Sequence, residues 1–231
     1  QATAKDPYPK TNTPLGWEGT LFAKKCFPVG SVVKIEFDEP GREWDYYGRV
    51  LGYVFYKKEG KWINYNVECV RQGMSPYSDK YGPSTRFELE FLEAEREARI
   101  NQRGIWAPGA MAYPDYDGRL RWWNQRGKAY KNFHAQYKGK PGVVDILNDV
   151  DWNKMESLTG TDVTLFGSFS FSGYDGSTAW LQLNHNDKLA MGVYVADSAL
   201  WAKVSPDLRA ADGELVYFKG KLRPAVELGP K

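Results

Sequence analysis

Apolar and polar positions along the first half of the chain follow the period of a helix in some stretches and that of a strand in others. Thr13 followed by proline is a typical helix start, and apolar residues then recur at helical spacing up to Cys26. Apolar and charged residues alternate over 31–38. A second alternating run, 47–55, places Arg49 on the same face as its apolar positions. The pattern predicts a helix followed by two strands.

A short turn leads from the second strand to the segment 61–64 and to two further predicted helices. Asn64 is a typical capping residue for a short helix that Gly73 closes. A longer amphipathic helix is predicted over 84–103, with Gly104 at its end. The first half of the chain therefore mixes short strands with three helices.

The last third of the chain has the pattern of a small β-domain. Alternating runs and turn residues predict three strands, a helix capped by Asp197 and a further strand, over 161–173, 178–183, 189–195, 198–204 and 213–223. This order, within about 70 residues, is that of a five-stranded Greek-key barrel, the OB-fold. We therefore expect an OB-like barrel in this part and a mixed β-barrel plus α architecture for the whole chain.

Composition and charge narrow the classes of function. The 231 residues are 42% hydrophobic, enough for a globular core. The net charge is only +2, so any contact with nucleic acid must come from a local patch. No apolar run approaches the ~20 residues of a membrane-spanning helix. The chain begins with Gln1 and shows no signal pattern of its own, so we expect that a signal peptide or a longer stretch of protein was removed upstream. The sequence does not fix the location, and export to the periplasm or the extracellular space after processing is the favoured interpretation.

The two cysteines and two histidines do not form a recognisable metal or catalytic motif. Cys26 and Cys69 lie on separate predicted helices, and with only His134 and His185 they cannot make a standard zinc cluster. The cysteines are expected to be either one disulfide or two buried thiols. Both histidines are interpreted as non-catalytic, since no Ser-His-Asp or Cys-His arrangement is present.

A set of motifs in the first half resembles the staphylococcal nuclease (thermonuclease) family. The matching pieces occur in the family's order and spacing over roughly 14–106: "PLGWEGTLFAKK", "VVKIEFD", "DYYGRVLGYVF", "GKWINYNVECVRQG", "YGP" and "RGIW". The resemblance implies an OB-type barrel and phosphodiester chemistry. It also implies that Arg49, the arginine after Tyr-Gly, contacts a phosphate and stabilises charge in the transition state. By the same resemblance Tyr47 and Tyr81 hold the nucleotide; alternatively, both tyrosines only cover the barrel rim.

The chain departs from the family where the metal site should begin. The family's first strands, its calcium-binding aspartate, its second arginine and an Asp-x-Pro-Glu motif have no counterpart; the opening "QATAK" contains neither acid, and Asp6 lies at the wrong spacing. Calcium requires several oxygen ligands, so no metal site is predicted in this chain, and calcium enters only if the acids lie upstream or on another chain. We expect an incomplete nuclease-like barrel whose missing strands come from an upstream segment or a partner protein.

Two further regions are candidates for contact with nucleic acid. The basic aromatic segment 119–140 interleaves cations with rings, a pattern typical of single-strand binding, and its candidate contacts are Arg119, Arg121, Trp122, Arg126 and Lys128. The alternative is an amphipathic helix between two domains. In the second barrel, Trp180 and Tyr194 are candidate stacking residues, or else part of the core.

These observations give an expected organisation and function. The expected parts are an arm (1–13), a nuclease-like domain (14–108), a basic aromatic linker or helix (109–145) and an OB-like barrel (146–231). The expected function is non-catalytic binding of DNA, RNA or a protein partner, either alone or as a subunit of a larger assembly. A purely structural protein that binds only other proteins is a further possibility. The alternative is an active calcium-dependent phosphodiesterase.

Overall fold

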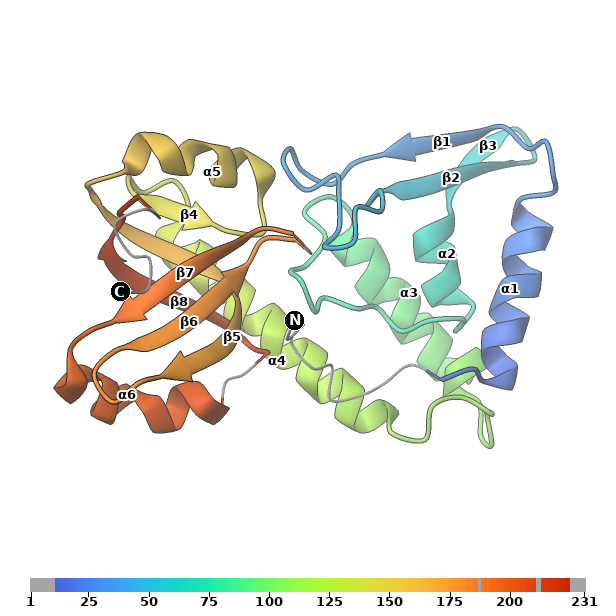
Figure 1. Cartoon of the computed structure of the whole chain (residues 1–231). Helices are drawn as coiled ribbons and strands as arrows, with labels where there is room; N and C mark the ends of the chain where they lie inside the picture. The colour runs from blue at the N-terminus through green and yellow to red at the C-terminus, as the bar shows by residue number, and fades with distance from the viewer. Residues whose placement is uncertain (1–10, 187, 211–212, 225–231) are drawn as a thin grey trace. The chain divides into compact units, whose positions relative to one another are not determined.

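A computed structural model describes residues 11–186, 188–210 and 213–224 (Figure 1). They form two compact units. The N-terminal unit comprises residues 11–39 and 51–127, and the C-terminal unit comprises 40–50 and the described residues from 128 onward. This division differs from the sequence-based ranges chiefly because the segment 40–50 groups with the C-terminal unit.

The N-terminal unit has a three-stranded antiparallel sheet in the order β1-β2-β3. Its elements are α1 (Pro14–Cys26), β1 (Val33–Glu36), β2 (Tyr53–Lys58), β3 (Lys61–Asn64), α2 (Tyr65–Arg71), α3 (Glu88–Ile100), the 3-10 helix η1 (Gly104–Trp106) and the first part of α4 (Tyr116–Tyr137). The sheet is open among the described residues. α2 and α3 pack together through the buried side chains of Val67, Val70, Phe91 and Ala94.

Side-chain caps fix where the helices of this unit begin. The Thr13 hydroxyl accepts the N–H of Gly16, and the Asn64 amide oxygen caps α2, as predicted. α3 begins at Glu88 rather than at residue 84, because the Ser84 hydroxyl accepts the N–H of Phe87 at 2.8 Å and holds a turn there. The prediction for α3 was therefore too long at its start. It was also too long at its end, because the helix stops at Ile100 with Asn101, and not Gly104, at its C-cap.

The second predicted strand was also too long. The strand β2 starts only at Tyr53, and residues 47–52 are turn and irregular backbone with a single antiparallel bridge, Trp44 to Val50. Gly48 has a φ of 74°, a conformation that extended strand cannot contain. Arg49 therefore lies on a loop and not on a strand face.

The C-terminal unit is built around one long strand. Its elements are the end of α4, β4 (Val143–Asp145), α5 (Asp149–Lys154), the 3-10 helix η2 (Met155–Leu158), β5 (Asp162–Tyr174), β6 (Ala179–Asn184), β7 (Ala190–Val195), α6 (Ser198–Ala210) and β8 (Leu215–Lys221). The first half of β5 pairs with β8 and, in parallel, with β4; its second half pairs with β6, which pairs with β7. The predicted strand-strand-strand-helix-strand order is correct, whereas β4 and α5 were not predicted.

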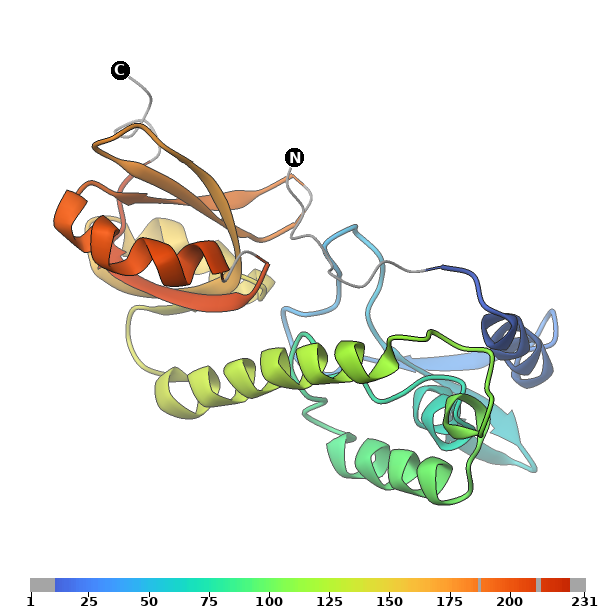
Figure 2. The ribbon, with the colours of Figure 1, turned by 90° about the horizontal axis from the view of Figure 1, so that it is seen from below.

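The predicted closure of this sheet into a barrel is not found. The described strands follow the path β4-β5-β6-β7, with β8 on β5, and no described ladder joins β7 back to the other end. The observed architecture is an open, mixed sheet with helices. α6 lies against the strands, where Trp201 packs beside Tyr174 (Figure 2).

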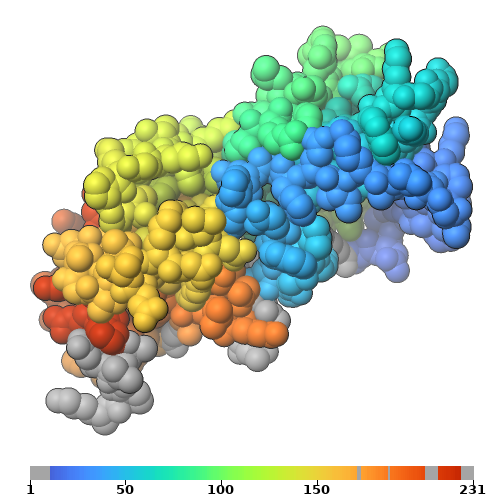
Figure 3. All heavy atoms as spheres, turned by 90° about the horizontal axis from the view of Figure 1, so that it is seen from above, coloured from blue at the N-terminus to red at the C-terminus, as the bar shows by residue number. Residues whose placement is uncertain are grey.

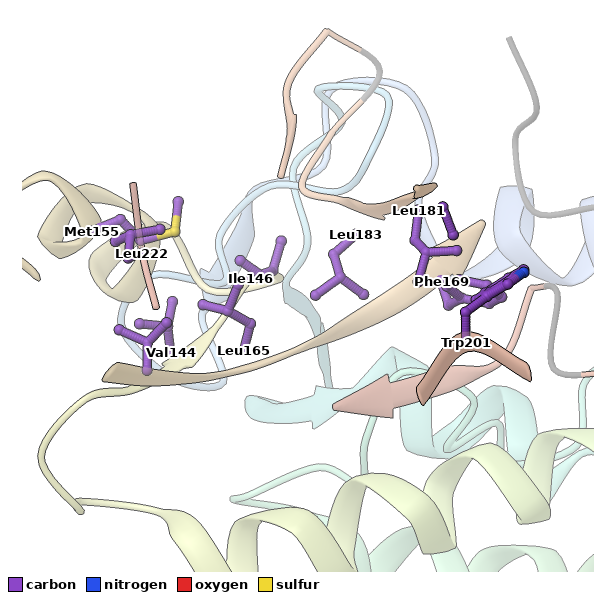
Figure 4. Packing of buried hydrophobic residues seen from close by; sticks show 11 residues of the cluster. Val144, Ile146, Met155, Leu165, Phe169, Leu181, Leu183, Trp201 and Leu222 are labelled. Atoms are coloured by element: carbon purple, nitrogen blue, oxygen red, sulfur yellow. The ribbon is translucent and has the colours of Figure 1, made fainter. Parts of the chain in front are cut away.

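The core of the C-terminal unit combines side chains from every layer (Figure 4). Val144 and Ile146 come from the β4 region, Leu165 and Phe169 from β5, and Trp201 from α6; all are almost fully buried. A second cluster, in which Phe133 of α4 stacks on Phe166 of β5 at 4.2 Å, attaches the end of α4 to the sheet. Burial of this apolar surface is the main source of the unit's stability.

The cysteines lie in the N-terminal unit as two free thiols. Burial raises the pKa of Cys69 to about 11 and also raises the pKa of Cys26. Both sulfurs are therefore protonated at neutral pH. Of the two expectations, the free-thiol state is the one this structure contains.

Among the described helices, none is both long and apolar enough to cross a membrane.

Candidate nucleic-acid interface

Arg49 is carried by the segment Pro40–Val50, here called the Arg49 loop, whose tip is a turn built on one carboxylate. Asp45 Oδ1 accepts the backbone N–H groups of Tyr47 at 2.9 Å and Arg49 at 2.8 Å. The Asp45 N–H donates to the Arg49 carbonyl at 2.8 Å, and the Gly48 N–H donates to the Asp45 carbonyl at 2.9 Å. A short polar side chain that bonds its own backbone two residues on is a common way to hold such a turn.

The same carboxylate orients the arginine side chain. Asp45 Oδ2 accepts Arg49 Nε at 2.6 Å and lies 2.5 Å from Arg49 Nη2. Burial alone would raise the pKa of Asp45, but the hydrogen bonds from Arg49 and from the backbone N–H groups outweigh it and hold that pKa below its usual range. Asp45 is therefore ionised at neutral pH and fixes the direction of the guanidinium.

The arginine nevertheless faces solvent. Its side chain is 71% exposed, and its guanidinium carbon lies 5.3 Å from the ring centre of Tyr47, which is 63% exposed. The Asp45 side chain is only 14% exposed, but the guanidinium it holds faces solvent, where a phosphate can compete with Asp45 for it. The planar fork of Arg49 suits two phosphate oxygens, and the Tyr47 ring beside it offers an aromatic face.

Tyr81, the third residue implied by the resemblance, belongs to the N-terminal unit. It is 57% exposed, and its ring has two cationic neighbours: Lys80 Nζ at 5.1 Å and the Arg126 guanidinium carbon at 5.6 Å. The Lys80 ammonium also lies 4.3 Å from the ring centre of Trp122. A basic aromatic group of the kind expected near a nucleotide is thus assembled in this unit.

The basic helix α4 contains both buried and exposed cations. Arg119 is 4% exposed and pairs with Asp115 at 2.6 Å, and Arg126 is 2% exposed and donates to the Lys80 carbonyl at 3.2 Å. Trp122 is also buried, whereas Arg121 and Lys128 are exposed. The structure therefore gives Arg119 and Arg126 internal partners, and only Arg121 and Lys128 of the predicted cations are turned to solvent.

Trp180 and Tyr194 lie opposite each other on neighbouring strands. They are register partners in the β6–β7 ladder, so their side chains share one face of the sheet. Tyr194 is 39% exposed. Glycines flank the pair: a Cβ on Gly173 would lie 3.6 Å from the Trp180 ring, and a Cβ on Gly192 would lie 3.1 Å from the Tyr194 ring. The structure thus brings these two predicted residues together with room for their rings.

The described residues do not fit a calcium ion. Within them, no group of three or more histidine, cysteine, aspartate or glutamate side chains is placed to hold a metal. The carboxylate of Asp45, beside Arg49, already accepts the backbone N–H groups of Tyr47 and Arg49 in its own turn. Calcium takes six to eight oxygen ligands, a requirement that this part of the chain does not meet.

The residues that anchor the Arg49 loop were missed by the sequence analysis. Pro40 contacts Asn148, 108 residues further along the chain, and Arg42 contacts Tyr130, 88 residues further along. The only signal in the sequence was Asn148 as a candidate helix cap before an Asp-Val-Asp run. A cap motif predicts a helix start and not the distant segment that packs on it.

Comparison with known proteins supports the nuclease-like assignment of the first half. The family model described as "Staphylococcal nuclease homologue" matches residues 2–108. An uncharacterized protein of Methanocaldococcus jannaschii is 35% identical over 39% of this chain and 42% of its own length. An uncharacterized protein of Bacillus anthracis is 33% identical over 40% and 41%. The thermonuclease of Staphylococcus hyicus is 29% identical over 42% and 55%.

The chain therefore carries a staphylococcal nuclease-like domain over residues 2–108. It spans about half, or less, of the length of these relatives. The Arg49 loop falls inside the matched region, and the strands β4 to β8 fall outside it.

Proposed function

We propose that this protein binds nucleic acid by holding a backbone phosphate on Arg49. The observation that carries the proposal is the exposed guanidinium of Arg49, fixed by Asp45 on a tight turn beside the exposed ring of Tyr47. The family resemblance supports it, because Arg49 occupies the position of the family's phosphate-contacting arginine.

Each residue of the turn has a separate part in this proposal. Arg49 supplies two parallel donors to phosphate oxygens. Tyr47 supplies a ring face for the sugar or base next to that phosphate. Asp45 holds the turn that carries Arg49 in place before binding and so reduces the ordering cost of binding, while its charge competes with the phosphate for the guanidinium.

A second contact is proposed at the Trp180–Tyr194 pair. Base-on-ring stacking is worth about 1–3 kcal/mol per base and tolerates any sequence. The shared face of these rings and the partial exposure of Tyr194 support stacking of a single-stranded segment. The proposed ligand is therefore single-stranded nucleic acid, bound through phosphate and stacking contacts.

The test is the affinity of the purified protein for a fluorescent single-stranded oligonucleotide. Arg49→Ala is expected to weaken binding about tenfold, because it removes a charged hydrogen bond to phosphate. Arg96→Ala is the matched control: the Arg96 side chain is 67% exposed on α3 and pairs with Glu93, which is 71% exposed. Its loss should change the affinity less than about twofold. Equal effects of the two substitutions would exclude a special role for Arg49.

A second candidate function is cleavage of the bound phosphodiester. It is favoured by the thermonuclease among the relatives and by the position of Arg49 in the family motif. The measurement is cleavage of a labelled strand with calcium and then with a chelator, for the parent protein and Arg49→Ala. Chelator-sensitive cleavage that Arg49→Ala abolishes would establish the enzyme; no cleavage in any condition would leave the binding function.

We also propose that an upstream segment or a partner protein covers the open sheet of the N-terminal unit. Val33, Ile35 and Phe37, on and just after the edge strand β1, are each more than 40% exposed. Exposed apolar residues on an unpaired edge are a typical site for a further strand. Addition of the covering segment should lower the binding of a hydrophobic dye to the protein; an unchanged dye signal would count against a cover at this edge.

A further inference from the structure

The Arg49 loop is attached at its base to the start of α5. The Asp149 N–H donates to the Gly41 carbonyl at 2.7 Å, and Asn148 Nδ2 donates to the Pro40 carbonyl at 3.1 Å. The same Asn148 side chain uses its oxygen to cap α5, accepting the N–H groups of Val150 and Asp151. One side chain therefore serves both the helix start and the loop. Figure 3 shows the loop, in blue, beside the α5 region, in gold.

Gly41 allows this attachment to be very close. It is buried, its φ is 82°, and a Cβ built on it would lie 2.4 Å from Asn148 Oδ1 and 2.9 Å from Val150 Cγ2. No larger residue fits there without displacing the loop or the start of α5.

A second attachment joins the loop to α4. Arg42 Nη1 donates to the Tyr130 hydroxyl at 2.6 Å, and the Arg42 guanidinium carbon lies 4.9 Å from the centre of the Tyr130 ring. Tyr130 is itself held in place, stacked on His134 at 4.0 Å and set edge-on to Phe166 at 5.9 Å. The loop is thus fixed at three consecutive residues, 40–42, by partners from α4 and from the start of α5.

We infer that Asn148 and Tyr130 are positioning residues for nucleic-acid binding, because they hold the base of the loop whose tip presents Arg49. This inference rests on the proposed function of Arg49. A loop that is ordered before it binds loses less conformational entropy on binding, and so binds more tightly. The phosphate contact of the nuclease-like domain would then depend on side chains outside the matched region 2–108.

The decisive variants remove only the attachments. Asn148→Asp keeps the oxygens that cap α5 and loses the donor to Pro40. Tyr130→Phe keeps the ring packing and loses the hydroxyl that Arg42 reaches. Asn153→Asp is the control for added charge, because Asn153 is an exposed residue of the same helix. Gly60→Ala is the control for Gly41→Ala, because Gly60 has a φ of 79° with no atom near its Cβ position.

Two readouts separate the inference from the proposed function. The first is hydrogen exchange of the Tyr47 and Arg49 amides, which needs no nucleic acid. The second is oligonucleotide affinity, measured in the parent and in an Arg49→Ala background. We expect the Asn148→Asp/Tyr130→Phe double variant to speed exchange about tenfold and to weaken binding about fivefold, with Gly41→Ala acting in the same direction. The controls should show neither effect.

The double variant should weaken binding no further once Arg49 is alanine, because its effect acts through that side chain. Unchanged exchange in the double variant, or an equal loss of affinity with and without Arg49, would overturn the positioning role. Faster exchange together with an Arg49→Ala variant of parental affinity would overturn the proposed function, while the anchoring of the loop would stand.

Discussion

Arg49 and Arg119 have the same kinds of neighbouring side chains but differ in their exposure to solvent. Each has an aspartate four residues earlier, at 2.5–2.6 Å, and each has a tyrosine ring beside its guanidinium, at 5.3 Å for Arg49 and 3.9 Å for Arg119. The Arg49 side chain is 71% exposed and the Arg119 side chain is 5% exposed. The local motif is shared; the surrounding structure decides whether the arginine can meet a ligand.

The difference follows from what holds each pair. Asp45 uses its carboxylate to hold backbone N–H groups of a turn, so the turn carries Arg49 outward. Arg119 lies in the first turns of α4, where packing of the helix covers its side chain. A buried, ion-paired arginine such as Arg119 contributes to the stability of the fold. An exposed arginine on a fixed turn, such as Arg49, can exchange its carboxylate partner for a phosphate.

The largest expected contrast is in stability. Arg119→Ala removes a buried side chain from under its tyrosine and leaves Asp115 without its partner, so we expect the Tm to fall by roughly 5 °C. Arg49→Ala should leave the Tm within about one degree, because surface ion pairs contribute little. Thermal unfolding followed by circular dichroism measures both. Equal shifts would mean that exposure does not separate the two arginines.

The next contrast concerns the shape of the cation. Arg49→Lys keeps the charge but loses the planar fork, and we expect oligonucleotide affinity to fall about fivefold with no change in Tm. Arg119→Lys should lower the Tm and leave affinity unchanged. Fluorescence anisotropy titrations in parallel with thermal melts test the pair. Parental affinity in Arg49→Lys would show that only charge matters at that position.

A smaller effect is expected from the aspartates. Asp45→Asn keeps an oxygen for the turn but removes a negative charge that competes with phosphate, so affinity should rise about twofold. Asp115→Asn should have no effect on affinity. The measurement is the affinity of each variant at several salt concentrations. A stronger phosphate contact in Asp45→Asn should make the slope of log affinity against log salt concentration steeper. A weaker complex in Asp45→Asn would mean that orientation by the carboxylate outweighs its charge.

The smallest effect is in the pH dependence of stability. Hydrogen bonds from Arg119 lower the pKa of Asp115, and those from Arg49 lower the pKa of Asp45 against the effect of burial. A lowered carboxyl pKa stabilises the fold above its unfolded value of about 3.9, and this stabilisation is lost as pH falls through the folded pKa. The Tm difference between the parent and Asp115→Asn should therefore stay constant from pH 7 to about 5 and shrink below about pH 4. The difference for Asp45→Asn should follow the same course with pH, because the pKa of Asp45 is also lowered. A difference that grew with acid would contradict the assigned direction.

Much of the fold could be predicted from the sequence because its signals are local. The caps at Thr13 and Asn64, and the alternation in β5 and β6, depend on neighbouring residues and were predicted correctly. The turn at Gly48 was missed because alternation continued through it, and α5 because six residues carry too little periodicity.

The candidate site was predictable only in part. Arg49, Tyr47 and Tyr81 came from motif resemblance, and the structure shows all three partly or mostly exposed. The burial of Arg119 and Arg126, and the contact of Asn148 with Pro40, depend on segments far apart in the chain. Spacing in one sequence carries no information about such contacts.

The hydrogen bonds between Asn148 or Asp149 and the base of the Arg49 loop also bear on how the protein can be divided. A fragment that ends at residue 108, where the family match ends, retains Arg49 and Asp45 but loses the side chains that hold residues 40–42. Such a fragment would keep the Arg49 motif but lose the contacts that hold its loop in place. If Arg49 binds phosphate as proposed, the stretch of chain needed for binding is therefore longer than the stretch that matches the family.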